Sequence, residues 1–255
     1  MRAYALTYPQ LMNQAQAMGC SASDLAQLRC AYELAEASVD GYYRAQGMPF
    51  ICHLVRTASI VLSEGQPVEA AAAALLHAAY MLHGFGGHGT PTAHQRRRLA
   101  DRIGGPAEAL IRHYDELPWY TEEALRAHLA SAGRYPMRTR QVLVMRLANE
   151  LEDYLDRAMA YRGGYPYEAR IESLGSTKVA LAAALGCPQL AEELAVAFRE
   201  HLERPLPAEV RRSQCHAYRL RRDPLAPLRK VARAAGKLAH RIRPAPASTP
   251  GGAHG

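Results

Sequence analysis

Long stretches rich in alanine and leucine, separated by glycine and proline, constrain the fold of this 255-residue chain more than any other feature. Alanine and leucine have high helix propensity, and runs of β-branched or aromatic residues are scarce. The pattern predicts an all-α fold. The chain is long enough for one large domain or two small ones with a sizeable core.

Capping residues and helix breakers indicate where the helices begin and end. Ser21 followed by Asp24 is typical of a helix N-terminus, and Pro49 suits the first turn of a helix. The glycine-rich segment 83–92 indicates a loop, and a further helix that carries His77 should precede it. The other expected helices cover about 8–18, 21–46, 49–64, 92–103, 106–116, 121–131, 136–161, 166–185 and 187–203.

The domain organisation follows from changes in composition. A helical domain is expected over 1–205, with its core at about 20–205, because the proline-containing segment ERPLPAEV (203–210) indicates a boundary. A basic helical extension is expected at 206–243. Residues 244–255 have the composition of a disordered tail.

The net charge of +7 is concentrated near the C-terminus, because the chain from Arg211 onward carries +10 and the rest carries −3. Apolar residues recur at helical spacing within 224–243, which predicts a basic amphipathic helix. Such a helix can pack on the domain, lie on an anionic membrane or bind an acidic partner through 211–243. Nucleic acid is a weaker expectation, because Tyr218 is the only aromatic residue there.

Several classes of protein are excluded by simple counts. The N-terminus has neither a continuous apolar stretch nor a cleavage site, which argues against a signal peptide, and the longest apolar-rich run is too short to span a bilayer. Five cysteines without a Cys-x-x-Cys motif argue against a disulfide framework or a zinc ribbon. We therefore expect a cytoplasmic protein.

Two histidines, His53 and His77, lie in mostly apolar helical segments. A buried imidazole needs a hydrogen-bond partner or a metal ion. Two sequence segments contain these histidines, and two more follow along the chain. In order they are RAQGMPFICH (44–53), AALLHA (73–78), IGGPAEALI (103–111) and LVMRLANELED (143–153). Over about 27–160 they resemble the HD-domain phosphohydrolases, most closely the hydrolase domain of RelA/SpoT-type guanosine polyphosphate enzymes.

The resemblance implies a divalent metal site, typically for manganese, formed by a histidine, a His-Asp pair and a later aspartate. His53 and His77 match the two histidines, but Ala78 and Asn149 replace the two aspartates. A hard divalent ion needs anionic ligands to offset its dehydration. We therefore expect a degenerate site at His53, His77 and Asn149, no bound cofactor, and one divalent metal such as manganese as the alternative.

The residues that act on substrate in the resembled enzymes are also replaced. Met81 and Leu82 stand at the Glu-Asp pair that activates the attacking water. Arg44 is kept near the expected nucleotide base, but Ala45 and Gln46 replace the lysine and serine that commonly follow it. We therefore expect Arg44, together with the two histidines and Asn149, to bind ligand without hydrolysing it.

Three interpretations of the histidine pair remain open. The pair is a hydrogen-bonded core element, with each other, Asn149 or a backbone carbonyl as partners; it belongs to a pocket that still binds a small ligand; or it is a working metal site with replacement ligands. The replacement ligands would come from His83, His88, Glu150 or Asp153. His77-Ala-Ala-Tyr80 also resembles a group of uncharacterised HD-like domains that lack the aspartate of the His-Asp pair.

Three functions are accordingly expected. The first is a catalytically degenerate HD-fold protein that binds a nucleotide or another phosphorylated ligand, or acts as an interaction module. The second is a metal-dependent phosphohydrolase related to the guanosine polyphosphate hydrolases. The third is a peripheral membrane or scaffold protein that acts through its basic C-terminal helix.

Overall fold

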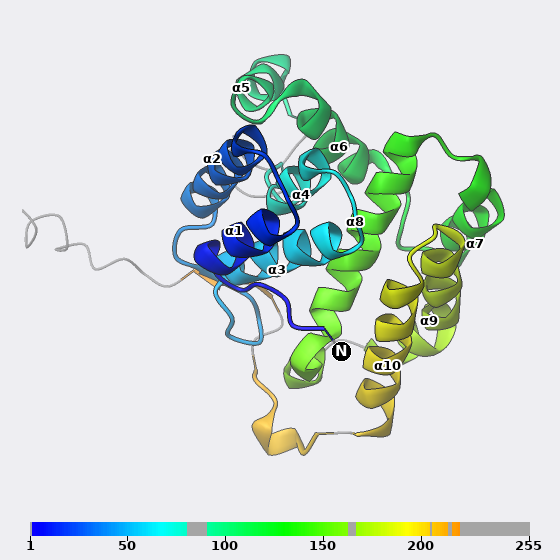
Figure 1. The fold of residues 1–255 in the computed structure, drawn as a ribbon. Helices are drawn as coiled ribbons and strands as arrows, with labels where there is room; N and C mark the ends of the chain where they lie inside the picture. Colours follow the sequence, from blue (N-terminus) through cyan, green and yellow to red (C-terminus); the bar gives the residue numbers. More distant parts are fainter. Residues whose placement is uncertain (1, 81–90, 163–166, 205, 214–215, 220–255) are drawn as a thin grey trace, which may run out of the picture. The chain divides into compact units, whose positions relative to one another are not determined.

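The structure of the protein, a computed structural model, describes residues 2–80, 91–162, 167–204, 206–213 and 216–219. It confirms an all-α fold, with helices α1 to α10 and one two-stranded sheet among these residues (Figure 1). None of the described helices is both long and apolar enough to cross a membrane.

Among the N-terminal helices, α2 and α3 pack against α4, and α1 packs on α2 and α3. Their bounds are α1 Tyr8–Ala17, α2 Ala22–Ser38, α3 Phe50–Ser63 and α4 Val68–Leu75. The expected N-cap of α2 is confirmed, since the Ser21 hydroxyl accepts from the Asp24 amide. The alanines at 70–74 are all fully buried, and α4 contacts α2, α3, α6 and α8. Small side chains allow these close helix approaches.

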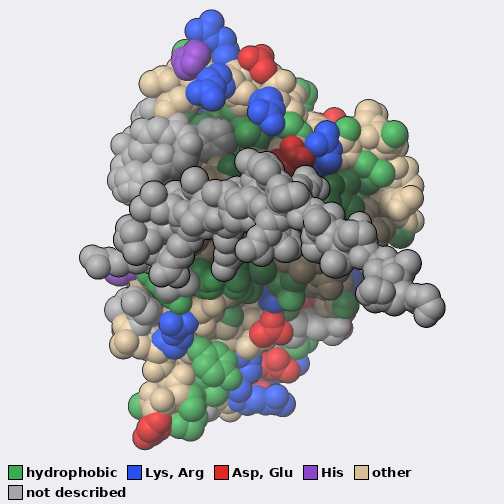
Figure 2. Space-filling view, turned by 90° about the vertical axis from the view of Figure 1, so that its left-hand side faces the viewer, with side chains coloured by type: hydrophobic (Ala, Val, Ile, Leu, Met, Phe, Trp, Pro, Cys, Tyr) green, Lys and Arg blue, Asp and Glu red, His purple; other side chains and the backbone are tan. Residues whose placement is uncertain are grey.

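The two helices that follow present a charged face to solvent. They are α5 Ala93–Ile103 and α6 Gly105–Glu116. Leu99 and Ile103 of α5 are buried, whereas Arg97, Arg98 and Arg102 are exposed. Lys and Arg side chains accordingly gather over α5 at the top of Figure 2. The helix is therefore amphipathic, with its apolar side toward α2 and α6.

Helix α8, Met137–Tyr154, runs between two groups of helices (Figure 1). On one side it contacts α3, α4 and α6, and on the other it contacts α9 and α10. The second group consists of α7 Glu122–Ser131, α9 Tyr167–Ala184 and α10 Pro188–Glu203, with the 3₁₀ turn η2 Ala132–Arg134 before α8. Residues on opposite faces of α8 therefore meet different parts of the fold.

The helix expected over 21–46 is shorter than predicted, because α2 ends at Ser38. The chain turns through Gly41, whose φ of +76° suits glycine, and forms strand β1, Tyr42–Tyr43. This strand pairs antiparallel with β2, Tyr218–Arg219, from the far end of the described chain. A pairing over so long a sequence separation is not visible in local propensity.

The helix expected over 136–161 is also too long. Helix α8 ends at Tyr154, and the 3₁₀ segment η3, Leu155–Tyr161, replaces its last two turns. Asp156 and Arg157 have φ angles of +55° and +57°, a left-handed conformation that breaks the helix and costs about 1–3 kcal/mol per residue. The Asp156 carboxylate reaches Arg56 of α3 at 2.7 Å, so tertiary contacts hold this turn.

One compact unit extends from the N-terminus to Arg219. The expected boundary at 205 falls inside this unit, because the 3₁₀ turn η4 Ala208–Val210 and β2 follow it, and the Arg212 amide donates to the Tyr161 carbonyl at 2.8 Å. The predicted amphipathic helix at 224–243 and the tail at 244–255 lie outside the described residues. The membrane and acidic-partner expectations for this segment stay predictions.

The close packing of α4 makes a first prediction. Ala72 is fully buried between helices, so Ala72→Leu should lower the free energy of unfolding by about 1–3 kcal/mol through overpacking. Chemical denaturation of the full chain measures this change. Ala26→Leu, on the exposed face of α2, is the matched control and should change stability by less than about 0.5 kcal/mol. Equal effects at both positions would contradict close packing at α4.

Candidate binding site at the histidine pair and helix α8

His53 and His77 come from neighbouring elements and lie side by side in the core. His53 is in α3 and is 2% exposed. His77 is not inside a helix, as expected, because α4 ends at Leu75 and His77 lies in the turn that follows. This turn directs the His77 ring toward His53, with 5.2 Å between ring centroids. The sequence therefore predicted the pairing of the two histidines and placed His77 in the wrong local structure.

A chain of hydrogen bonds runs through the two rings. Glu152 of α8 contacts His53 Nδ1, and His53 Nε2 lies 3.3 Å from His77 Nε2. His77 Nδ1 lies 2.7 Å from the Ala74 carbonyl and donates to it. The Asn149 side chain is a further hydrogen-bond partner of His53. The partners expected for a hydrogen-bonded core pair are all present, namely the other histidine, Asn149 and a backbone carbonyl. Glu152 is an additional partner.

Burial decides where the protons of this chain lie. It raises the pKa of Glu152 to about 7, against the opposing effect of Arg44 and Arg56. Burial lowers the pKa of His53 strongly, and burial together with His53 lowers the pKa of His77 to about 3. Both rings are therefore neutral. Because burial favours the protonated carboxyl, the arrangement that satisfies both contacts has the Glu152 hydroxyl donating to His53 Nδ1 and His53 Nε2–H donating to His77 Nε2.

Two arginines surround the carboxyl end of this chain. Arg44 lies 3.8 Å from Glu152 and forms an ion pair with Asp153. Arg56 Nε lies 4.0 Å from Glu152 Oε1, an oxygen with no hydrogen-bond partner among the described residues. Arg44, which was expected near a nucleotide base, is thus engaged by the carboxylates of Glu152 and Asp153. Both guanidinium groups favour the ionised form of Glu152, so they oppose the rise in its pKa that burial causes.

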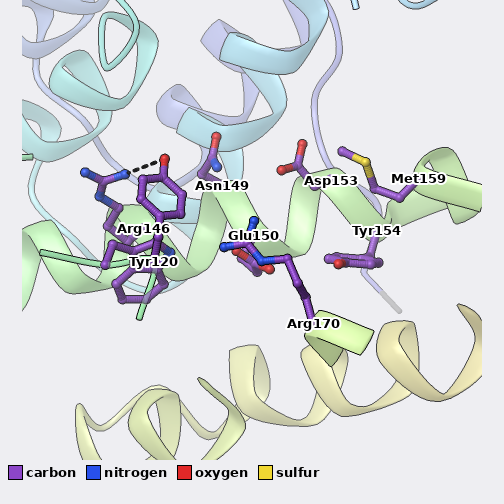
Figure 3. A pocket seen from close by; sticks show the side chains of 9 residues that line it. Tyr120, Arg146, Asn149, Glu150, Asp153, Tyr154, Met159 and Arg170 are labelled. Carbon is purple, nitrogen blue, oxygen red and sulfur yellow. Dashed lines mark hydrogen bonds between the residues drawn. The ribbon is translucent and has the colours of Figure 1, made fainter. Parts of the chain in front are cut away.

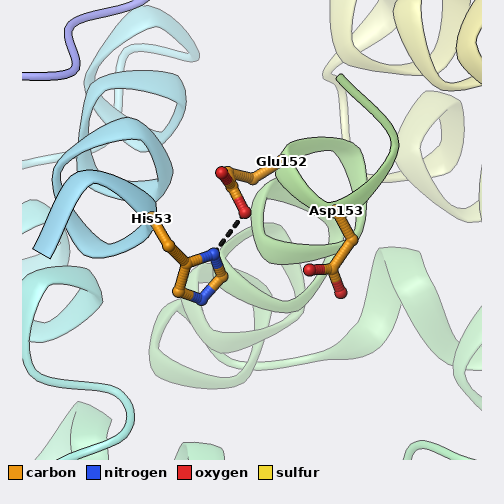
Figure 4. A group of neighbouring side chains, drawn as sticks. All are labelled: His53, Glu152 and Asp153. Carbon is orange, nitrogen blue, oxygen red and sulfur yellow. Dashed lines mark hydrogen bonds and ion pairs between the residues drawn. The ribbon is translucent and has the colours of Figure 1, made fainter. Parts of the chain in front are cut away.

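His53, Glu152 and Asp153 offer ligand atoms within 4.8 Å of one another (Figure 4). The 3.3 Å between the two histidine Nε2 atoms also matches two nitrogen ligands at about 2.0–2.1 Å from one ion. However, Glu152 is bound to His53, and Asp153 is paired with Arg44. One imidazole and two carboxylates suit zinc or manganese by donor type, but here all three side chains are engaged with protein partners.

A cavity of about 100 Å³ lies on the other side of α8 (Figure 3). Its lining includes one stripe of α8, spaced at helical intervals, and residues from the α6–α7 connection, η3 and α9. Figure 3 shows Arg170 of α9 reaching toward Glu150 and Tyr120 beside Arg146. The lining residues are Trp119, Tyr120, Arg146, Asn149, Glu150, Asp153, Tyr154, Met159 and Arg170.

The cavity and the histidine pair are joined through Asn149, which lines the former and contacts His53. Of the predicted ligand-binding residues, Arg44 reaches the cavity only through its ion pair with Asp153. Sequence reasoning missed Glu152 and Arg146. Both follow the helical spacing from Asn149, three positions to either side, and that spacing was the available signal.

Two of the replaced positions that the structure describes are buried alanines, and the other two, Asn149 and Gln46, are polar. Ala78 is buried beside His77, and Ala45 is buried next to Arg44. Met81, Leu82, His83 and His88 lie outside the described residues, so their expected roles stay predictions. Gln46 is half-buried, and its amide nitrogen has no partner among the described residues.

One family model matches part of the chain. Residues 34–118 are similar to DUF6817, a domain of unknown function. This third of the chain includes Arg44, His53 and His77 and ends before α8. No curated protein matches the chain. The comparisons therefore support no activity.

The raised pKa of Glu152 makes a prediction about pH. Its folded-state pKa of about 7 lies above the unfolded value near 4.5, so its stabilising contribution is complete below pH 4.5 and declines as pH rises through 7. Glu152→Gln keeps a donor to His53 and cannot ionise. Relative to wild type, this variant should therefore gain stability from pH 5 to pH 8, by at most about 1.4 kcal/mol per pH unit.

Thermal unfolding of both proteins across this pH range measures the difference. The lowered pKa values of the two histidines destabilise the folded state as pH falls below 6.5, but they do so in both proteins and cancel. Glu172→Gln, exposed on α9, is the control for a lost charge and should show no such trend. A pH-independent difference for Glu152→Gln would mean that Glu152 is ionised throughout.

Proposed function

We propose that the protein is a cytoplasmic binding or regulatory module, a catalytically degenerate relative of the HD-domain phosphohydrolases, whose ligand is a nucleotide or another phosphorylated molecule. The observation that carries this proposal is the hydrogen-bonded chain Glu152–His53–His77. When both rings are neutral, the Nε2 atoms of His53 and His77, which a catalytic metal would require, are already paired with each other. These hydrogen bonds therefore support a structural role for the two histidines, next to a binding site.

The neighbouring cavity supports the ligand class. Arg146 and Arg170 supply guanidinium groups, which bind phosphate through paired hydrogen bonds. Tyr120 is 65% exposed and supplies a ring on which a flat base can stack. A volume of about 100 Å³ holds a phosphate-sized group and not a whole nucleotide. The remainder of the ligand would extend over Tyr120.

Calorimetric titration of the full chain with GDP, GTP and guanosine tests this proposal. The expected result is binding of the two nucleotides, at least tenfold weaker binding of guanosine, and no release of phosphate with manganese present. Binding of none of the three would contradict the proposal for nucleotides. Manganese-dependent hydrolysis would instead support the second candidate function.

That second candidate is a metal-dependent phosphohydrolase with replacement ligands. It is favoured by one observation, the convergence of His53, Glu152 and Asp153 within 4.8 Å. Elemental analysis of untagged protein, expressed with manganese and zinc supplied, tests it. Near-stoichiometric metal that is lost in His77→Ala would support a hydrolase. Metal-free wild-type protein would leave the binding module as the better proposal.

The likeness to HD domains makes its own prediction. If Ala78 and Asn149 occupy the positions of the lost aspartates, Ala78→Asp with Asn149→Asp should restore a manganese site with His53 and His77. Two buried carboxylates without a cation destabilise the fold, so manganese should raise the melting temperature of the double variant by several degrees.

Differential scanning calorimetry with and without manganese measures this effect. Wild type should not respond, and adding His77→Ala to the double variant should abolish the response. A double variant that folds and ignores manganese would contradict the assignment of these positions.

A further inference from the structure

Arg146 is a buried cation without a counter-charge. It is 6% exposed, and it forms no ion pair with a carboxylate of the described residues. One terminal nitrogen donates to the Tyr114 carbonyl, and the other lies 3.4 Å from the Tyr120 hydroxyl, at the limit of a hydrogen bond. Its Nε–H has no acceptor among the described residues. A buried guanidinium without an ion pair is unfavourable, and an anion would supply the missing acceptor and counter-charge.

Aromatic rings orient this guanidinium without neutralising it. The Arg146 Cζ lies 3.8 Å from the centroid of the Tyr114 ring, and Tyr114 packs in turn against His77. A second guanidinium, that of Arg170, lies 5.6 Å from the centroid of the Tyr120 ring, the same distance as Arg146. Two guanidinium groups therefore lie against one exposed ring at the cavity.

The carboxylates that line the cavity do not supply this anion. Glu150 forms an ion pair with Lys178, which is itself buried, and Asp153 forms one with Arg44. Both carboxylates are therefore paired with other cations, and neither forms an ion pair with Arg146 among the described residues.

We propose that the cavity beside α8 is an anion subsite, in which the guanidinium of Arg146 binds a phosphate group and the Tyr120 hydroxyl is displaced by a phosphate oxygen. The inference rests on the proposed function, since it assigns the ligand chemistry of the same site. It concerns the phosphate alone, and it does not require a nucleoside or an HD-type origin. A free phosphate, a pyrophosphate or the phosphate of a nucleotide supplies the same chemistry.

Titration of the full chain with inorganic phosphate, pyrophosphate, GDP and guanosine tests the subsite, at constant ionic strength adjusted with chloride. Wild type should bind pyrophosphate and GDP, and it should bind guanosine at least tenfold more weakly than GDP. Arg146→Met removes the charge but keeps an apolar side chain over Tyr114, and it should weaken pyrophosphate binding roughly ten- to hundredfold. Arg138→Met, exposed on the same helix, removes the same net charge and should bind as wild type does.

A second variant guards against loss of folding. Arg146→Lys keeps the charge and loses the planar fork, so it should bind pyrophosphate several-fold more weakly while its circular dichroism matches wild type. This variant decides the question if Arg146→Met does not fold. Unchanged affinity in the folded Arg146 variants, or an equal loss in Arg138→Met, would overturn the subsite.

The probes separate this inference from the proposed function. Arg146-dependent binding of pyrophosphate without binding of GDP would support the subsite and contradict the nucleotide as ligand. Binding of GDP without any dependence on Arg146 would support the function and overturn the subsite. Absence of binding to all four probes would overturn both.

Discussion

The contact of Glu152 with His53 is the interaction on which the rest of the core arrangement depends. It joins α8 to α3, and the same chain continues through His77 to the Ala74 carbonyl at the end of α4. A buried polar network is favourable only when its members are satisfied, so a shift of any of the three elements along its axis would leave an unpaired group. The chain therefore specifies how the three helices align.

Helix α8 places this network and the cavity on different faces. Glu152 points toward α3, whereas Arg146, Asn149 and Asp153 line the cavity. Asn149 and the Arg44–Asp153 ion pair connect the two. A ligand bound at the cavity would thus act on groups that contact the buried histidines.

Charge pairing dominates the surroundings of His53. The carboxylates near this ring are matched by Arg44 and Arg56. Arg146, by contrast, is buried without an ion pair among the described residues, on a helix beyond the segment that matches DUF6817. An anionic ligand complements such a site better than a cation does.

The sequence by itself determined the helical class, most helix boundaries, the capping of α2 and the presence of a histidine pair, because these follow from local propensity and spacing. Tertiary structure alone decided which residues and strands contact one another. His53 and Glu152 are 99 positions apart, and β1 pairs with the far end of the described chain. The left-handed turn at Asp156 and the uncompensated charge of Arg146 likewise arise from packing between helices. Such contacts depend on how distant segments share one core, and no local pattern encodes that arrangement.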